Sequence, residues 1–194
     1  MKKIILIFVF ISFTANSQQP GFSFTGYNKS ISLYRAKEFV IKEVLGVEEK
    51  QQVRFEIDPL AASNSGELTS LSYVCDEKKI KGFVLGFFKQ YYNEYGIGKY
   101  QYKFLNFTEE KARYILLKLA TLIKSEAPRF ADNPDHNIYF QYDGIIYLIY
   151  NDFIYSGDEL VIGTKIRVFW DEFDSEWSFM AFERTRRRFE RKMK

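Results

Sequence analysis

Cysteine and histidine are almost absent from the 194-residue sequence, which contains one of each, Cys75 and His136. A single cysteine excludes an internal disulfide, and one cysteine with one histidine excludes the common structural zinc sites. Cys75 lies in an apolar segment typical of a strand, so we expect a buried and unreactive thiol. A Cys75–His136 catalytic dyad is disfavoured, because Cys75 lacks the glycine-rich or helix-N-terminal setting that activates a thiol.

Long apolar runs are also scarce, and the longest one lies near the start, in residues 4–13. A pair of lysines precedes it, and Ala15 and Ser17 follow at the positions that a signal peptidase reads. This pattern predicts a secretory signal peptide over residues 1–17 and an exported, periplasmic or extracellular protein. We expect no lipid anchor, because no cysteine follows the predicted cleavage site. We also expect no transmembrane segment, because no later run approaches the roughly 20 apolar residues of a membrane helix.

The sequence lacks the motifs of common nucleotide-binding and hydrolytic folds, since it has no P-loop, dinucleotide-binding, nucleophile-elbow or zinc-protease motif. We therefore expect no cofactor and no metal. Carboxylates are the remaining resource for catalysis, and the weak candidates are Asp58 and Glu67, which flank a loop containing Ser63 and Ser65. That loop lacks the alternating ligands of an EF-hand, so a surface loop is favoured over a calcium site.

Aromatic residues, in contrast, are abundant and make up 19% of the chain. Most of them suit the pleated, half-buried surface of strands and need no other role. Tyr91, Tyr92 and Tyr95 differ because they lie beside a predicted turn, residues 93–98, where exposed rings can contact a sugar or a peptide. We therefore predict a binding surface at these three tyrosines.

Positive charge is concentrated at the C-terminal end. The formal net charge of the whole chain is +3, while residues 183–194 carry seven basic and two acidic side chains. The apolar residues at helical spacing in this region are Phe182, Phe189 and Met193. This spacing predicts a short basic helix docked on the body, with a free cationic arm as the alternative. Arg186, Arg187 and Arg188 are candidates for contact with an anionic envelope surface, whereas nucleic acid is not an expected partner of an exported protein.

Hydrophobic periodicity predicts two main helices and a series of strands. Residues 19–28 are expected to form a leader without regular structure. A first helix is expected from its N-cap, Ser32, to Gly46, and a second from its N-cap, Thr108, to Pro128. The predicted strands are residues 52–57, 69–75, 80–88, 100–104, 137–142, 145–150, 165–170 and 177–183. Asp143-Gly144 favours a type I′ turn, and the strand 145–150 is apolar on both faces, which predicts cover on both sides.

These elements predict an α+β fold of antiparallel meander sheets, with two main helices and a short C-terminal basic helix, in one domain over residues 18–194. The order of one helix and four strands, repeated once, also fits a tandem α-β4 duplication. The scarcity of histidine and cysteine and the wealth of aromatics predict an exported, non-catalytic binding module for a protein or glycan partner. The alternative is a carboxylate-based hydrolase acting on a cell-envelope or extracellular polymer.

Overall fold

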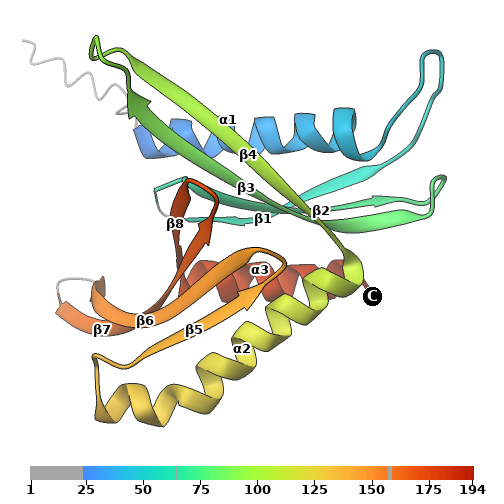
Figure 1. Cartoon of the computed structure of the whole chain (residues 1–194). Helices are drawn as coiled ribbons and strands as arrows, with labels where there is room; N and C mark the ends of the chain where they lie inside the picture. Colours follow the sequence, from blue (N-terminus) through green and yellow to red (C-terminus); the bar gives the residue numbers. More distant parts are fainter. Residues whose placement is uncertain (1–23, 64, 157–158) are drawn as a thin grey trace, which may run out of the picture.

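The computed structural model describes residues 24–63, 65–156 and 159–194, and the predicted signal peptide, residues 1–17, lies outside the described residues. Within these ranges, three α-helices and two four-stranded antiparallel sheets confirm the predicted α+β class (Figure 1). No helix of this described part is long and apolar enough to cross a membrane.

Each sheet is a meander that follows a helix. Sheet A and its helix comprise α1 (Phe24–Phe39), a π-helical turn (Val40–Val44), β1 (Glu56–Ala62), β2 (Leu68–Cys75), β3 (Ile80–Tyr92) and β4 (Gly98–Thr108). Sheet B and its helix comprise α2 (Glu109–Asp132), β5 (Asn137–Tyr142), β6 (Ile145–Ser156), β7 (Glu159–Trp170) and β8 (Phe173–Ser178). Helix α3 (Phe179–Lys192) follows. In both sheets the strands lie side by side in chain order, which confirms the predicted repetition of the element order.

Sheet A is covered on both faces. Helix α1 lies on one face, where Ala36 and Val40 are fully buried in a cluster with Leu71 of β2. Helix α3 and sheet B lie on the other face (Figure 1). There Phe83 of β3 meets Phe189 of α3 edge to face, with the ring centroids 5.5 Å apart. The main core therefore lies between the two sheets.

Helix α2 begins at the predicted N-cap but ends later than predicted. The Thr108 hydroxyl accepts a hydrogen bond from the Lys111 N–H at 3.4 Å, as expected of an N-cap. The buried stripe consists of Ala112, Ile115, Leu116, Leu119, Ile123 and Phe130. Pro128 does not end the helix, which continues to Asp132. Phe130 lies in the last turn and is buried in the core, and this burial offsets the hydrogen bond that a proline cannot donate.

The start of the first helix was predicted wrongly. Helix α1 is already helical from Phe24, so Ser32 lies inside it as a buried residue rather than at its N-cap. Residues 24–28 therefore belong to the helix and not to the predicted leader. Ser32 lies between apolar residues, so in the sequence it resembles the N-cap of a helix that begins there.

The first strand is shifted relative to its prediction. Residues 52–55 are not in a strand, and β1 runs past Pro59 instead of ending before it. Proline is tolerated here because β1 is an edge strand, with a register shift between Pro59 and Ala61.

In sheet B the predicted hairpin turn is confirmed, because Asp143 and Gly144 have φ values of 54° and 78°. The predicted strand 177–183 is wrong beyond Ser178. The Ser178 hydroxyl accepts a hydrogen bond from the Ala181 N–H at 3.3 Å and so caps α3. The residues that follow Ser178 are therefore helical.

The basic C-terminal segment is the docked helix that the sequence predicts, not a free arm. Phe182 and Phe189 are fully buried, and Met193 is 5% exposed. Thr185, on the same helix, shares a hydrogen bond of 2.9 Å with Ser70 of β2. Helix α3 therefore belongs to the core and connects both sheets.

Candidate functional site

Strands β3 and β4 form a long hairpin whose far end projects from the body (Figure 1). Asn93 begins its turn, and the Asn93 side-chain oxygen accepts hydrogen bonds from the N–H groups of Tyr95 and Ile97 at 3.1 and 2.8 Å. Gly96 has a φ of 72°, a value that suits glycine. Asn93 and Gly96 therefore fix the conformation of the turn, and the residues beside it point outward.

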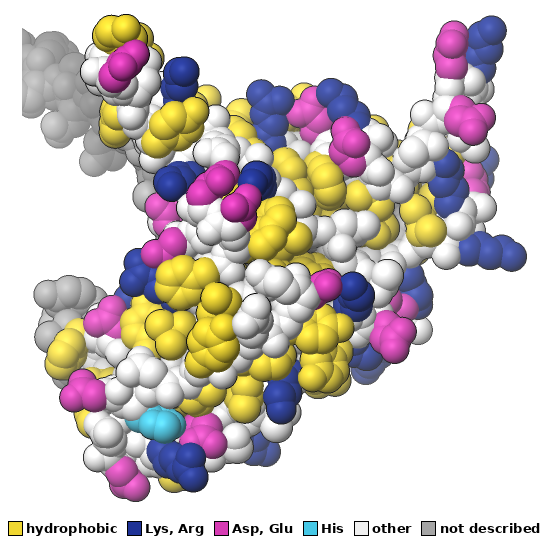
Figure 2. Space-filling model, in the orientation of Figure 1, with side chains coloured by type: hydrophobic (Ala, Val, Ile, Leu, Met, Phe, Trp, Pro, Cys, Tyr) yellow, Lys and Arg dark blue, Asp and Glu magenta, His cyan; other side chains and the backbone are white. Residues whose placement is uncertain are grey.

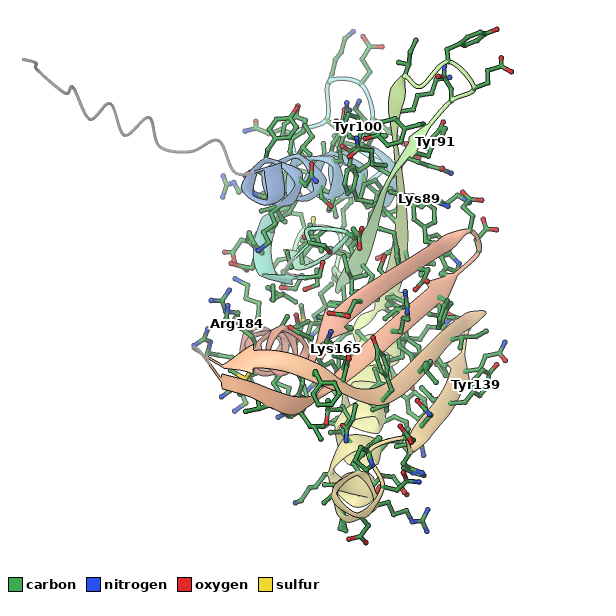
Figure 3. The ribbon with its side chains drawn as sticks, turned by 90° about the vertical axis from the view of Figure 1, so that its left-hand side faces the viewer. Lys89, Tyr91, Tyr100, Tyr139, Lys165 and Arg184 are labelled. Carbon is green, nitrogen blue, oxygen red and sulfur yellow. The ribbon has the colours of Figure 1, made fainter. Side chains whose placement is uncertain are left out.

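The predicted tyrosine surface lies on this projecting end. Tyr92 and Tyr95 are 68% and 77% exposed, and Tyr91 is 41% exposed. Ile97 and Tyr100 are exposed beside them, although the sequence pattern did not single them out. Figure 2 shows hydrophobic side chains at the end of the hairpin, and Figure 3 shows Tyr91 and Tyr100 on it.

The hairpin has two different faces, because neighbouring side chains of a strand point to opposite sides. Tyr92 lies on the same face of the hairpin as the residues that pack against α1 nearer the body. Tyr91 lies on the opposite face, toward sheet B. On the α1 side, Phe88 stacks on Tyr100 with ring centroids 5.6 Å apart, and the Arg35 guanidinium lies 6.0 Å from the Tyr102 ring centroid. A row of aromatic rings therefore extends from the core toward the tip.

Contacts on the other face brace the hairpin against sheet B. Lys103 forms ion pairs with Asp171 and Glu172 in the β7–β8 turn, and the Gln101 amide donates to Glu172. The ammonium group of Lys103 also lies 5.8 Å from the Trp170 ring centroid. The hydrogen bond to Asp171 raises the pKa of Lys103 above its ordinary value. These bracing contacts hold the base of the hairpin and leave its last residues free of the body.

The predicted arginine group is divided by the packing of α3. Arg186 is held by Glu183 and Glu190 at 2.9 and 2.8 Å, and Arg188 donates to the Leu60 carbonyl at 2.6 Å. Arg187 is exposed, and among the described residues it donates only to the Glu183 carbonyl of its own helix. Two of the three predicted arginines are thus engaged within the protein.

The two carboxylates proposed for catalysis are not brought together. Asp58 pairs with Ser72 in the β1–β2 ladder and forms an ion pair with Lys192 at 2.8 Å. Glu67 directly precedes β2 and lies five residues from Ser72, which at about 3.3 Å per residue of extended chain corresponds to a separation of roughly 16 Å. Glycosidase carboxyl pairs lie about 5–9.5 Å apart, so this pair does not form such a site.

Sheet B has an open face, contrary to the prediction that residues 145–150 are covered on both sides. Ile145, Tyr147 and Ile149 are fully buried on the inner face, while Ile146, Leu148 and Tyr150 are only half-buried on the outer face. In Figure 3 the strands of sheet B lie in front of α2, with Tyr139 and Lys165 on them. An antiparallel sheet tolerates one solvated face, and here polar residues alternate with the apolar ones across the strands.

The remaining sequence candidates are placed in ordinary structural roles. Cys75 is fully buried, as predicted. His136 is half-buried and packs against the Phe130 ring, with its Nε2 3.4 Å from a Glu126 oxygen. Among the described residues, no group of histidine, cysteine, aspartate or glutamate side chains is arranged to hold a metal ion.

Comparison with known proteins gives no further guide, because no family model, no curated protein and no solved structure matches the chain significantly. The projecting hairpin of sheet A is therefore the candidate functional site. Its glycines and the asparagine at residues 93–98 signalled the turn in the sequence. The lengths of β3 and β4, which make the turn project, carried no such signal.

Proposed function

We propose that the protein is an exported, non-catalytic binding module that recognises a partner through the exposed tyrosines of the β3–β4 hairpin. The observation that carries this proposal is the exposure of Tyr92 and Tyr95 at the end of a hairpin that projects from the body. Large apolar rings cost free energy when they face water and release it when a partner covers them. Tyrosine also offers a hydroxyl for a hydrogen bond, so such a surface suits a folded protein, a peptide or a glycan.

Export is part of the proposal and rests on the pattern of residues 1–17, which resembles a secretory signal peptide. The contact of α3 with an anionic surface is a weaker part, because Arg186 and Arg188 already bind groups within the protein. The hydrolase alternative has no comparable observation in its favour, since Asp58 and Glu67 lie far apart.

The proposal is tested by binding of immobilised protein to separated protein and glycan fractions of the cell envelope of the producing organism. The double variant Tyr92→Ser/Tyr95→Ser is expected to bind the recognised fraction at least about tenfold more weakly than the unchanged chain, with an unchanged melting temperature. Both side chains are exposed, so their removal leaves the core intact.

Phe153→Ser is the matched control, because Phe153 is another exposed aromatic residue, 64% exposed, on a long strand of the other sheet. It is expected to bind like the unchanged chain. Equal binding by all three proteins, or equal loss in the control, would show that the hairpin tyrosines are not the recognition surface.

A further inference from the structure

The two edges of sheet A differ in how they are protected. At the β1 edge, Pro59 and the register shift beside it interrupt regular pairing. Helix α3 also lies along this strand, where Arg188 binds the Leu60 carbonyl and Lys192 binds Asp58. Proline, irregular register and a covering helix are the features by which proteins prevent unwanted strand pairing at an edge. The β1 edge is therefore closed.

Within the described part of the chain, the β4 edge has no proline, no register shift and no covering helix. Strand β4 is 11 residues long and pairs with β3 in continuous register from Gly82↔Thr108 to Tyr92↔Gly98. None of its residues from Gly98 to Asn106 is buried, whereas every residue of β3 from Gly82 to Phe88 is buried. Among the described residues, no strand pairs with the outer side of β4.

The hydrogen-bond pattern shows which groups of β4 point outward. The Phe88 N–H donates to the Glu67 carbonyl at 2.8 Å, so it faces β2 and not β4. The N–H of Asn93 donates to the Ile97 carbonyl at 3.1 Å, which fixes the same alternation from the other end of the hairpin. Because bonded and non-bonded pairs alternate in an antiparallel ladder, the N–H and C=O groups of Tyr100, Tyr102 and Phe104 point away from β3.

The side chains beside the β4 edge indicate what kind of peptide strand could bind there. Tyr100, Tyr102 and Phe104 present rings on one face of β4, and Lys99 and Lys103 lie on the other. Asp171 and Glu172 already balance the charge of Lys103, whereas Lys99 is exposed. A second copy paired edge to edge would place its own lysines on the same side, and like charges that face each other across strands are destabilising.

We propose that the β4 edge binds an extended, acidic peptide segment of a partner protein, which adds a fifth strand to sheet A. This inference rests on the proposed binding function and names its partner class and mode. The main chain of the segment pairs with the outward groups of Tyr100 and Tyr102. Its apolar side chains lie beside the tyrosine row, and its carboxylates lie beside Lys99. Backbone pairing of this kind supplies affinity, while alternate side chains supply specificity.

The test uses the full chain and a short fluorescent peptide in which glutamate alternates with valine. Fluorescence anisotropy is expected to show saturable binding of this peptide and binding about tenfold weaker for a version with N-methylated backbone amides. The N-methylated peptide keeps the side chains but loses the main-chain donors. Equal binding of the two peptides, or no binding of either, overturns strand addition.

Two variants of the chain sharpen the test. Tyr100→Pro removes an outward N–H without removing a donor to β3, and is expected to weaken peptide binding about tenfold. Lys99→Glu is expected to weaken binding of the glutamate peptide several-fold, as expected of an exposed ion pair, and to favour a lysine-containing peptide of the same pattern. Unchanged binding in both variants contradicts the proposed edge.

The outcomes separate this inference from the proposed function. If Tyr92→Ser/Tyr95→Ser abolishes capture of the envelope partner while Tyr100→Pro leaves capture unchanged, binding through the tyrosines stands and strand addition falls. If sedimentation shows that Tyr100→Pro dissociates a dimer of the unchanged chain, the occupant of the edge is a second copy, and the acidic-peptide proposal falls.

Discussion

The two halves of the chain have the same order of elements but use their sheets differently. Sheet A is covered on both faces, by α1 on one side and by α3 and sheet B on the other. Within the described residues, sheet B is covered only on its inner face, by α2, α3 and sheet A. Sheet A therefore presents a projecting hairpin and the long unpaired edge of β4, which has 11 residues. Sheet B presents an open face, and its edge strands β5 and β8 have only six residues each.

The open face of sheet B is adapted to water. Lys165 forms ion pairs with Asp152 and Glu176 at 2.9 and 3.0 Å, and Arg167 forms one with Asp174 at 2.7 Å. These pairs satisfy the charged groups across neighbouring strands. The end of the sheet A hairpin instead exposes tyrosines, with the charged residues Glu94 and Lys99 beside them. The proposed binding surface is therefore placed on the hairpin, whose exposed rings are not part of such a network of ion pairs, rather than on the open face of sheet B.

The largest expected effect comes from breaking the element that joins the halves. Phe189→Ala removes a fully buried ring that contacts Phe83, and should lower the free energy of unfolding by about 3–5 kcal/mol. Arg191→Ala, at an exposed position of the same helix, should change it by less than about 0.5 kcal/mol. Denaturant melts measure both. Similar losses in the two variants would contradict the docking of α3.

A core substitution confined to the second half should have a similar or smaller effect. Leu119→Ala in α2 is expected to cost about 2–5 kcal/mol, because the side chain is fully buried in the main core. Lys118→Ala, one residue earlier on the exposed side, should leave the melt almost unchanged. If thermal unfolding of Leu119→Ala occurs in two separate steps, the halves do not share one cooperative core.

A smaller, pH-dependent effect is expected from Glu183 in α3. The hydrogen bond from Arg186 holds the pKa of Glu183 below its ordinary value. A lowered folded pKa contributes stability above the unfolded pKa, and this stability is lost as the pH falls through the folded pKa. Glu183→Gln should therefore cost about 1 kcal/mol at neutral pH and progressively less in acid.

The control for this pH dependence is Glu38→Gln in α1. Glu38 also has a lowered pKa, through hydrogen bonds from Lys42 and Arg35, but its partners are well exposed and screened by salt. Its effect should be smaller and should disappear at high salt. A larger effect at Glu38 than at Glu183 would contradict the expectation that the more exposed ion pairs of α1 contribute less stability.

Much of the fold was predictable, because local signals were strong. The helical periodicity of α2, its cap at Thr108 and the turn at Asp143-Gly144 depend on neighbouring residues, and all three were predicted correctly. Pro59 and Pro128 were misread as ends, because an edge position and the burial of Phe130 decide those sites and both are tertiary properties. The candidate site was predictable only at the tyrosines, since an unpaired edge depends on the order of strands in the sheet.

Amide hydrogen exchange along β4 in the free protein tests the central claim most directly. If the β4 edge is unpaired, the N–H groups of Tyr100, Tyr102 and Phe104 exchange rapidly, while those of Gln101 and Lys103, which face β3, are protected by orders of magnitude. This alternation of fast and slow amides is the predicted result. Uniform protection along β4 would show that another strand already occupies the edge, and would contradict the account.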